Sequence, residues 1–149
     1  MSRVVFLDSG PLGALCNVRA SPMSVACNRW LRALDDANVR VVIPEIADYE
    51  IRRELIRAVR RKNLARLDRL TFQLEYLPLT TAAMRRAAEF WAQARQQGQP
   101  TAGDNTIDAD MILAGQVIAA GERNYVIATT NPAHLSRFVV AELWSSITP

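Results

Sequence analysis

The first hydrophobic run of the chain, at residues 4–8, reads Val-Val-Phe-Leu-Asp. Its β-branched and aromatic residues are typical of a buried strand, and the run ends in an aspartate. An ionised carboxylate is costly to bury unless a partner compensates its charge. A metal ion would be such a partner, so we expect Asp8 to belong to a metal site where this strand meets its loop.

Four further short apolar runs are candidates for strands. The clearer two lie at 39–43 and 125–130 and are rich in β-branched residues, whereas those at 75–79 and 138–144 are weaker. Because helical patterns separate the runs, the sequence predicts an α/β domain with a mainly parallel central sheet.

Parallel sheets bind ligands beyond the carboxyl ends of their strands. Asp8 ends the first predicted strand, and Asn131 follows the run at 125–130. If these two strands are neighbours, Asp8 and Asn131 share one rim of the sheet.

The segments between these runs carry apolar residues at helical spacing. One such series comprises Met23, Cys27, Trp30, Leu31 and Leu34. A second comprises Met84, Ala87, Ala88 and Trp91, with Thr80 or Thr81 available as the N-cap. Residues 45–70 predict one or two helices interrupted near Asn63, and 96–103 predict a polar loop.

Length and composition predict a single domain spanning residues 1–149, because half of the residues are apolar and can form one sizeable core. No apolar stretch approaches the roughly 18 residues of a membrane span, and no signal-peptide pattern occurs at the N-terminus. We therefore expect a cytoplasmic protein without a membrane partner. Cys16 and Cys27 fall in apolar helical patterns, which favours reduced, buried thiols over a disulfide.

Two further carboxylates are placed to point inward from helices. In a helix over 107–120, Asp110 lies on the apolar stripe, and Glu50 shares a helical face with Ile46 and Ala47. Asp108 lies about 200° around the helix from Asp110, so it reaches the same site only at or before the first turn, and it is otherwise an N-cap.

The carboxylates of Glu45 and Asp48 point elsewhere, and we expect both to be surface charges.

Eight of the eighteen basic residues fall between positions 52 and 69, with only Glu54 and Asp68 as acids among them. Seventeen of the eighteen are arginines, whose guanidinium groups can bind phosphate oxygens in pairs. The segment is consistent with a polyanionic partner such as nucleic acid, or with a solvated helix face.

Four segments together resemble the ordered motifs of PIN-domain nucleases, a family that includes the VapC-type toxins of bacterial toxin-antitoxin pairs. They are Phe-Leu-Asp-Ser-Gly at 6–10, Ile-Pro-Glu-Ile-Ala-Asp-Tyr-Glu-Ile-Arg-Arg-Glu-Leu at 43–55, Asp-Ala-Asp-Met-Ile-Leu-Ala-Gly at 108–115, and Ala-Thr-Thr-Asn-Pro-Ala-His-Leu at 128–135. The resemblance spans nearly the whole chain and implies a three-layer α/β/α sandwich.

The resemblance also implies roles for individual residues. Asp8, Glu50 and Asp110 match the family's acidic metal-binding positions. Asn131 falls at a fourth catalytic position that is often Asp, so a second metal ion would need the charge of Asp108. Ser9 would orient a ligand carboxylate or a phosphate, and we expect RNA to be steered by Arg52, Arg53 and Arg57.

The function expected from these residues is that of a Mg²⁺- or Mn²⁺-dependent endoribonuclease that hydrolyses RNA phosphodiester bonds. Its expected partners are an RNA substrate, an antitoxin protein if it is a toxin, and a second copy of the chain. Two alternatives stay open: a PIN-like module that binds RNA or protein without cleaving, and a DNA nuclease.

Overall fold

The computed structural model describes the backbone at residues 3–98 and 104–149 and the side chains at 3–98 and 108–149. Its centre is a sheet of five parallel strands in the order β3-β2-β1-β4-β5. The strands are β1 (Val4–Leu7), β2 (Val41–Pro44), β3 (Glu75–Leu77), β4 (Tyr125–Thr129) and β5 (Ala141–Leu143). The predicted α/β class is confirmed, and all five apolar runs form strands.

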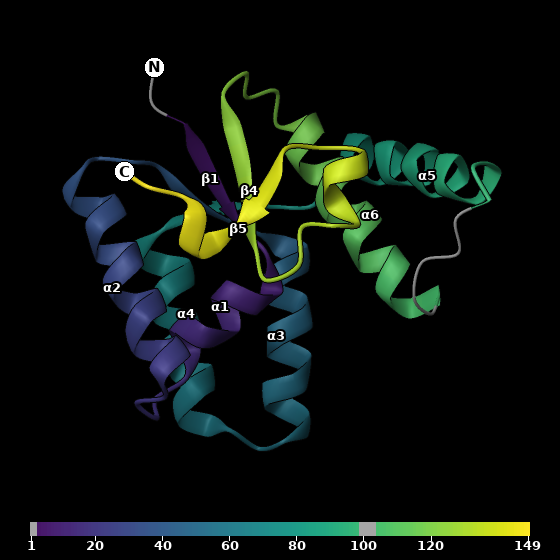
Figure 1. Cartoon of the computed structure of the whole chain (residues 1–149). Coiled ribbons are helices and arrows are strands. Elements are labelled where there is room, and N and C mark those ends of the chain that lie inside the picture. The colour runs from purple at the N-terminus through teal and green to yellow at the C-terminus, as the bar shows by residue number, and fades with distance from the viewer. Residues whose placement is uncertain (1–2, 99–103) are drawn as a thin grey trace.

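Six α-helices surround this sheet. They are α1 (Ser9–Cys16), α2 (Pro22–Asp36), α3 (Glu45–Arg57), α4 (Arg61–Gln73), α5 (Thr81–Gln96) and α6 (Asp104–Ala119). Two short 3₁₀ helices, η1 (Leu135–Arg137) and η2 (Trp144–Ser146), flank β5. Helices α1, α2 and α4 gather on one side of the sheet, and α5 and α6 on the other (Figure 1).

Each face of the sheet buries its own core, because successive side chains of a strand point to opposite faces. Phe6 of β1 packs in the core formed with α5 and α6, where it lies with Phe90 and Leu113. Leu7 packs in the other core, which also contains Leu34 of α2. The result is the three-layer α/β/α sandwich expected from the sequence.

The order of the strands brings the carboxyl ends of β1 and β4 together. The chain first adds β2 and β3 on one side of β1, and then crosses through α5 and α6 to place β4 on the other side. The backbone N–H of Asp8 continues this pairing by donating to the carbonyl of Ala128 at 2.9 Å. Such a reversal of strand order is where open α/β sheets form their ligand sites.

The predicted break near Asn63 is wrong, because α3 ends at Arg57 and α4 begins at Arg61, so that Asn63 lies inside α4. The chain turns at Val59, which has a left-handed φ of 54°. The N–H of Arg60 bonds to the carbonyl of Leu55 and that of Val59 to Ile56, which satisfies the helix end in a Schellman arrangement. A β-branched residue at this position gives no sequence signal for a helix end.

The apolar face expected on α5 is only partly buried. Ala87 is in the core, but Met84 and Trp91 are 45% and 39% exposed. Helix α5 instead turns its small residues toward α6, where a Cβ on Gly115 would come within 2.4 Å of the carbonyl oxygen of Ala83. Close approach of the two backbones therefore selects the buried face.

Two local predictions are confirmed. The hydroxyl of Thr80 caps α5 by accepting a hydrogen bond from the N–H of Ala83 at 3.0 Å. Cys16 and Cys27 are free, buried thiols, and burial raises the pKa of each to about 12. Neither thiol is therefore activated as a nucleophile.

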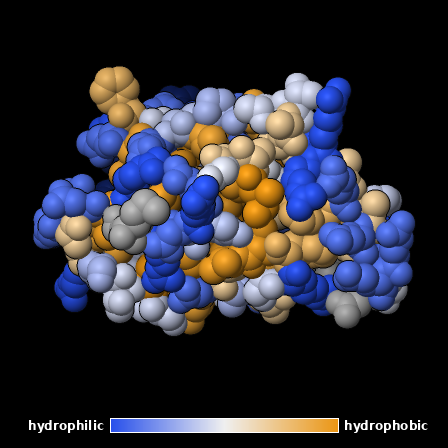
Figure 2. Space-filling view, turned by 90° about the horizontal axis from the view of Figure 1, so that it is seen from above, coloured by the Kyte–Doolittle hydropathy of each residue, from blue (hydrophilic) through white to orange (hydrophobic). Residues whose placement is uncertain are grey.

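Hydrophobic side chains reach the surface at the centre of the face seen in Figure 2, with hydrophilic residues on both sides. Within the described ranges of the chain, no helix combines the length and the apolar character needed to cross a membrane.

Candidate active site

Asp8 stands at the junction of β1 and α1, where it is also the N-cap of α1. Its Oδ1 accepts a hydrogen bond from the N–H of Ser9 at 2.7 Å, and its Oδ2 accepts one from Oγ1 of Thr129 at 2.7 Å. Burial raises the pKa of Asp8, while these two hydrogen bonds lower it. The carboxylate is therefore held in one orientation at the switch point between β1 and β4.

Thr129 is a site residue to which the sequence alone assigned no role. It is 1% exposed, and its Oγ1 also accepts a hydrogen bond from the N–H of Asn131 at 3.2 Å. Gly10 lets the start of α1 approach this strand end, because a Cβ there would lie 2.7 Å from Cγ2 of Thr130. A threonine at the end of a strand adjacent to the aspartate strand was the available signal.

Glu50 and Asp110 bring two more carboxylates to the same rim, from α3 and α6 respectively. Burial, followed by the charges of Asp8 and Asp110, raises the pKa of Glu50 to about 7, although Arg53 opposes the shift. Burial and the charge of Asp8 raise the pKa of Asp110 to about 6. Both carboxylates therefore lie within electrostatic range of Asp8, and their role as metal ligands stays a prediction.

The three carboxylates repel one another without being in ligand contact. Among the described residues, no three acidic, imidazole or thiol groups are close enough, as placed, to hold one metal ion. A cation bound among them would compensate the charges that disfavour their ionisation. The oxygen-only donor set suits a hard cation such as Mg²⁺ or Mn²⁺.

Gln116 anchors α6, the helix that carries Asp110. Its side chain is buried, and its Oε1 accepts a hydrogen bond from the N–H of Ile46 at 3.0 Å. Its Nε2 donates to the carbonyl of Leu77 at 2.9 Å. No role was predicted for this residue, although a lone amide in the apolar run Ile-Leu-Ala-Gly-Gln-Val-Ile at 112–118 could have indicated a buried hydrogen-bonding group.

Asp108 does not join the carboxylates. Because α6 begins at Asp104, Asp108 lies beyond the first turn, and its exposed side chain lines an apolar groove with Met84, Trp91 and Met111. Asp108 would reach the site only from a position at or before the first turn, and it does not occupy such a position.

Asn131 is exposed at the rim of the sheet beyond β4. Its Oδ1 accepts a hydrogen bond from the N–H of Ala133 at 3.3 Å. The side-chain oxygen thus supports the local turn in this conformation.

The predicted surface positions of Asp48 and Glu45 are wrong. Asp48 is 8% exposed, pairs with Arg52 at 3.0 Å and accepts a hydrogen bond from the hydroxyl of Tyr76 at 2.7 Å. The partly buried Glu45 accepts one from the N–H of Leu79 at 2.7 Å. Both carboxylates tie α3 to the segment of β3.

The four residues expected to contact nucleic acid lie in different surroundings. Ser9 opens α1 directly beside Asp8. Arg52 is held between Asp48 and Asp68, and Arg57 pairs with Glu54. Arg53 packs over the ring of Tyr49 at 5.1 Å and lowers the pKa of Glu50. Of the three arginines, Arg53 is the one whose charge acts on the acidic cluster.

Comparison with known proteins gives similarity of structure only. No family model and no curated protein matches the chain. The similar solved structures include VapBC2 from Rickettsia felis bound to a DNA fragment from its promoter, with a TM-score of 0.70 and 19% identity over 95% of this chain and 98% of that one.

Two further similar structures are VapBC complexes. DNA-bound VapBC from Salmonella typhimurium has a TM-score of 0.68 and 22% identity over 97% of this chain and 99% of that one. VapBC-1 from nontypeable Haemophilus influenzae has a TM-score of 0.64 and 18% identity over 95% and 98%.

The five-stranded parallel sheet between two layers of helices thus defines an α/β protein with the PIN-domain fold. More particularly, the fold is VapC-like over nearly the full length of the chain, as the four sequence motifs implied.

Proposed function

We propose that this protein is a metal-dependent endoribonuclease that hydrolyses RNA phosphodiester bonds, with Mg²⁺ or Mn²⁺ held by Asp8, Glu50 and Asp110. The observation that carries the proposal is the electrostatic coupling of three carboxylates near the switch point of the sheet: the charge of Asp8, after β1, raises the pKa of Glu50 in α3 and of Asp110 in α6.

The residues present fit a divalent cation. All three donors are carboxylates, and Asp8 already has a fixed orientation through Ser9 and Thr129. When bound, such an ion supplies Lewis acidity toward phosphate oxygens and a lowered pKa of bound water. Without a cation, the negative charges of the cluster repel one another, and binding of a cation would relieve this repulsion.

The chain's own groups then have distinct tasks. Asp8 provides a rigid ligand position, because both of its oxygens are hydrogen-bonded. Glu50, whose pKa burial and the charges of Asp8 and Asp110 raise to about 7 without metal, would be ionised beside a bound cation and complete the ligand set. We assign the binding of phosphate oxygens to Arg53, whose charge acts on Glu50, and to Ser9, which adjoins Asp8. Asn131 adds a neutral amide at the rim.

The partners belong to the same proposal. The VapC-like fold supports a role as the toxin of a toxin-antitoxin pair, with an antitoxin protein as the regulatory partner. Homodimer formation remains part of the proposal and is measurable by light scattering of the purified protein. We assign no metal-binding role to Asp108, which lines an exposed groove. Arg52 is likewise given no role there, because it is paired with Asp48 and Asp68.

The test is incubation of the purified protein with RNA and with DNA, in the presence of Mg²⁺, Mn²⁺ or EDTA. We expect cleavage of RNA that requires the metal and stops in EDTA. Cleavage confined to DNA would identify a DNA nuclease instead. Absence of both cleavage and metal binding would identify a non-catalytic binding module and contradict the proposal.

A further inference from the structure

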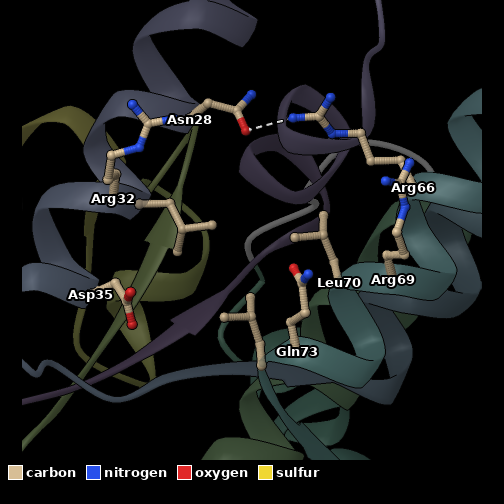
Figure 3. Close-up of a pocket in the computed structure, with 9 residues that line it drawn as sticks. Asn28, Arg32, Asp35, Arg66, Arg69, Leu70 and Gln73 are labelled. Atoms are coloured by element: carbon tan, nitrogen blue, oxygen red, sulfur yellow. Dashed lines mark hydrogen bonds between the residues drawn. The ribbon is translucent and has the colours of Figure 1, made fainter.

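A cleft of about 520 Å³ lies between α2 and α4. None of the three carboxylates of the candidate active site lines it. Arg32 extends from α2, and Arg66 and Arg69 extend from α4 on the opposite wall (Figure 3). Nη2 of Arg66 donates to Oδ1 of Asn28 at 3.0 Å, which joins the two walls.

This cleft continues into two others. A space of about 300 Å³ shares Arg32 and Arg66 with the first and adds Arg19 and Arg29. A third, of about 500 Å³, shares Arg19 with the second and extends past Arg57 and Arg60. We call the three together the arginine groove. It runs from the α2–α4 pair to the connection between α3 and α4.

The charge of the groove is largely uncompensated. Its arginines are Arg19, Arg29, Arg32, Arg57, Arg60, Arg66 and Arg69. Its acidic residues are Asp35 and Glu54, and Glu54 is already paired with Arg57.

Some arginines outside the groove have acidic partners. Arg3, Arg40 and Arg86 each pair with glutamate. By contrast, none of the described acidic side chains forms an ion pair with Arg19, Arg29, Arg32, Arg60 or Arg69. Several unpaired guanidinium groups along one groove attract a polyanion whose charges are spaced along a chain.

The chemistry of the lining selects the kind of polyanion. Among the described residues, no aromatic side chain lines any of the three clefts, so these walls lack the platforms on which single-stranded bases stack. Guanidinium groups and the amides of Asn28 and Gln73 are suited to phosphate and sugar oxygens. Base-paired RNA presents these oxygens on its surface while its bases stay stacked.

We infer that the arginine groove binds the phosphodiester backbone of base-paired RNA. While the groove holds this part of the RNA, another part of the same RNA molecule reaches the three carboxylates. The inference deepens the proposed function, on which it rests for RNA as the ligand. An acidic protein segment is the competing occupant, and Leu31, Leu70 and Leu74 would offer it apolar contacts. The seven arginines of the groove face only two acidic residues, and a phosphodiester backbone, with one charge at every nucleotide, matches that row of positive charge more closely.

The test measures binding apart from cleavage. A fluorescent RNA duplex of about 16 base pairs is titrated with protein in EDTA, and binding is followed by anisotropy over a series of salt concentrations. The groove variant is Arg32→Gln with Arg69→Gln, both exposed and without ion-pair partners among the described residues. The matched control is Arg85→Gln with Arg123→Gln, which removes the same charge from exposed positions outside the groove.

We expect the groove variant to lose at least about tenfold in affinity and its log–log salt dependence to flatten by about two, while the control stays within about twofold of the unmodified protein. Equal losses in both variants, or none in either, would overturn the inference. It would also be overturned if single-stranded RNA bound as tightly as the duplex, or if polyglutamate bound in preference to RNA.

Failure of the proposed function is separable from failure of this inference. If the protein binds duplex RNA through the groove in EDTA but does not cleave RNA with Mg²⁺, the inference about the groove stands and the proposed nuclease activity is refuted. A protein that cleaves RNA without any contribution of the groove retains the nuclease alone.

Discussion

Oγ1 of Thr129 donates a hydrogen bond to Oδ2 of Asp8 at 2.7 Å, which joins residues 121 positions apart in the sequence. The contact exists because β1 and β4 pair in parallel, with Leu7 opposite Ala128. The hydrogen bond fixes the orientation of the Asp8 carboxylate. The geometry of the candidate site therefore depends on the register between β1 and β4.

Replacing Thr129 with valine removes this donor while keeping nearly the same volume. The pKa of Asp8 should rise further, because one of the two hydrogen bonds that lower it is lost. Since such supporting contacts typically contribute 10- to 100-fold to metal-site activity, we expect kcat/KM for RNA cleavage to fall by about that factor. The measurement is the cleavage rate over a range of Mg²⁺ concentrations.

Thr129→Ser is the matched control, because it keeps the hydroxyl and should keep most of the activity. If the valine variant were as active as the serine variant at limiting Mg²⁺, the positioning role of Thr129 would be refuted.

The apo protein should lose stability as the pH rises from about 5 to about 8. Glu50 and Asp110 have pKa values of about 7 and about 6 in the folded state, above the usual values of about 4 for unfolded carboxyls. Between these limits the folded chain binds more protons than the unfolded chain, so the free energy of unfolding falls with rising pH. Denaturant unfolding in EDTA across this range measures the effect.

The same measurement has an internal control in Glu50→Gln, which cannot ionise at this position. We expect the variant to show a flatter pH dependence and a smaller rise in melting temperature on addition of Mg²⁺. A pH dependence of stability that is unchanged in the variant would show that the pKa of Glu50 is not raised by its surroundings.

Gly115→Ala should destabilise the protein by about 1–3 kcal/mol or more, because its Cβ would lie 2.4 Å from the carbonyl oxygen of Ala83 and 2.9 Å from the backbone N of Ala87. Backbone atoms of α5 cannot yield as a side chain can. Urea unfolding of the variant measures the cost.

Gly13→Ala is the comparison. This glycine is also helical, but its added Cβ would meet only the end of the Ile51 side chain, at 3.0 Å. We expect a change within about 1 kcal/mol, since alanine favours helix and the isoleucine can shift. Equal losses at both glycines would contradict the tight packing of α5 against α6.

The residues that could be placed well from the sequence are those whose charge conflicts with an apolar pattern. Asp8 ends a buried strand, and Asp110 sits on the apolar stripe of α6, so the cost of burying an unpaired charge is enough to predict a partner for both. Periodicity alone was sufficient for Glu50, because its helix follows β2 directly.

The residues placed poorly depend on contacts between distant segments. Asp48 is buried because Tyr76, 28 positions away, and Arg52 satisfy its oxygens, and no local pattern contains that information. The role of Asp108 depended on where α6 begins, and helix ends are the least readable feature of a sequence. The break at Val59 uses a left-handed backbone that a β-branched residue rarely adopts.

The most direct test of the central claim compares RNA cleavage by the unmodified protein and by Asp8→Asn in Mg²⁺. Asparagine can keep both local hydrogen bonds, since its amide oxygen can accept from the N–H of Ser9 and its amide nitrogen can donate to Thr129. The variant should therefore fold normally, as shown by an unaltered circular dichroism spectrum, and lose cleavage by a factor of about 100 or more, of the order expected when a ligand charge is removed. Cleavage at the unmodified rate by a folded Asp8→Asn protein would contradict the account.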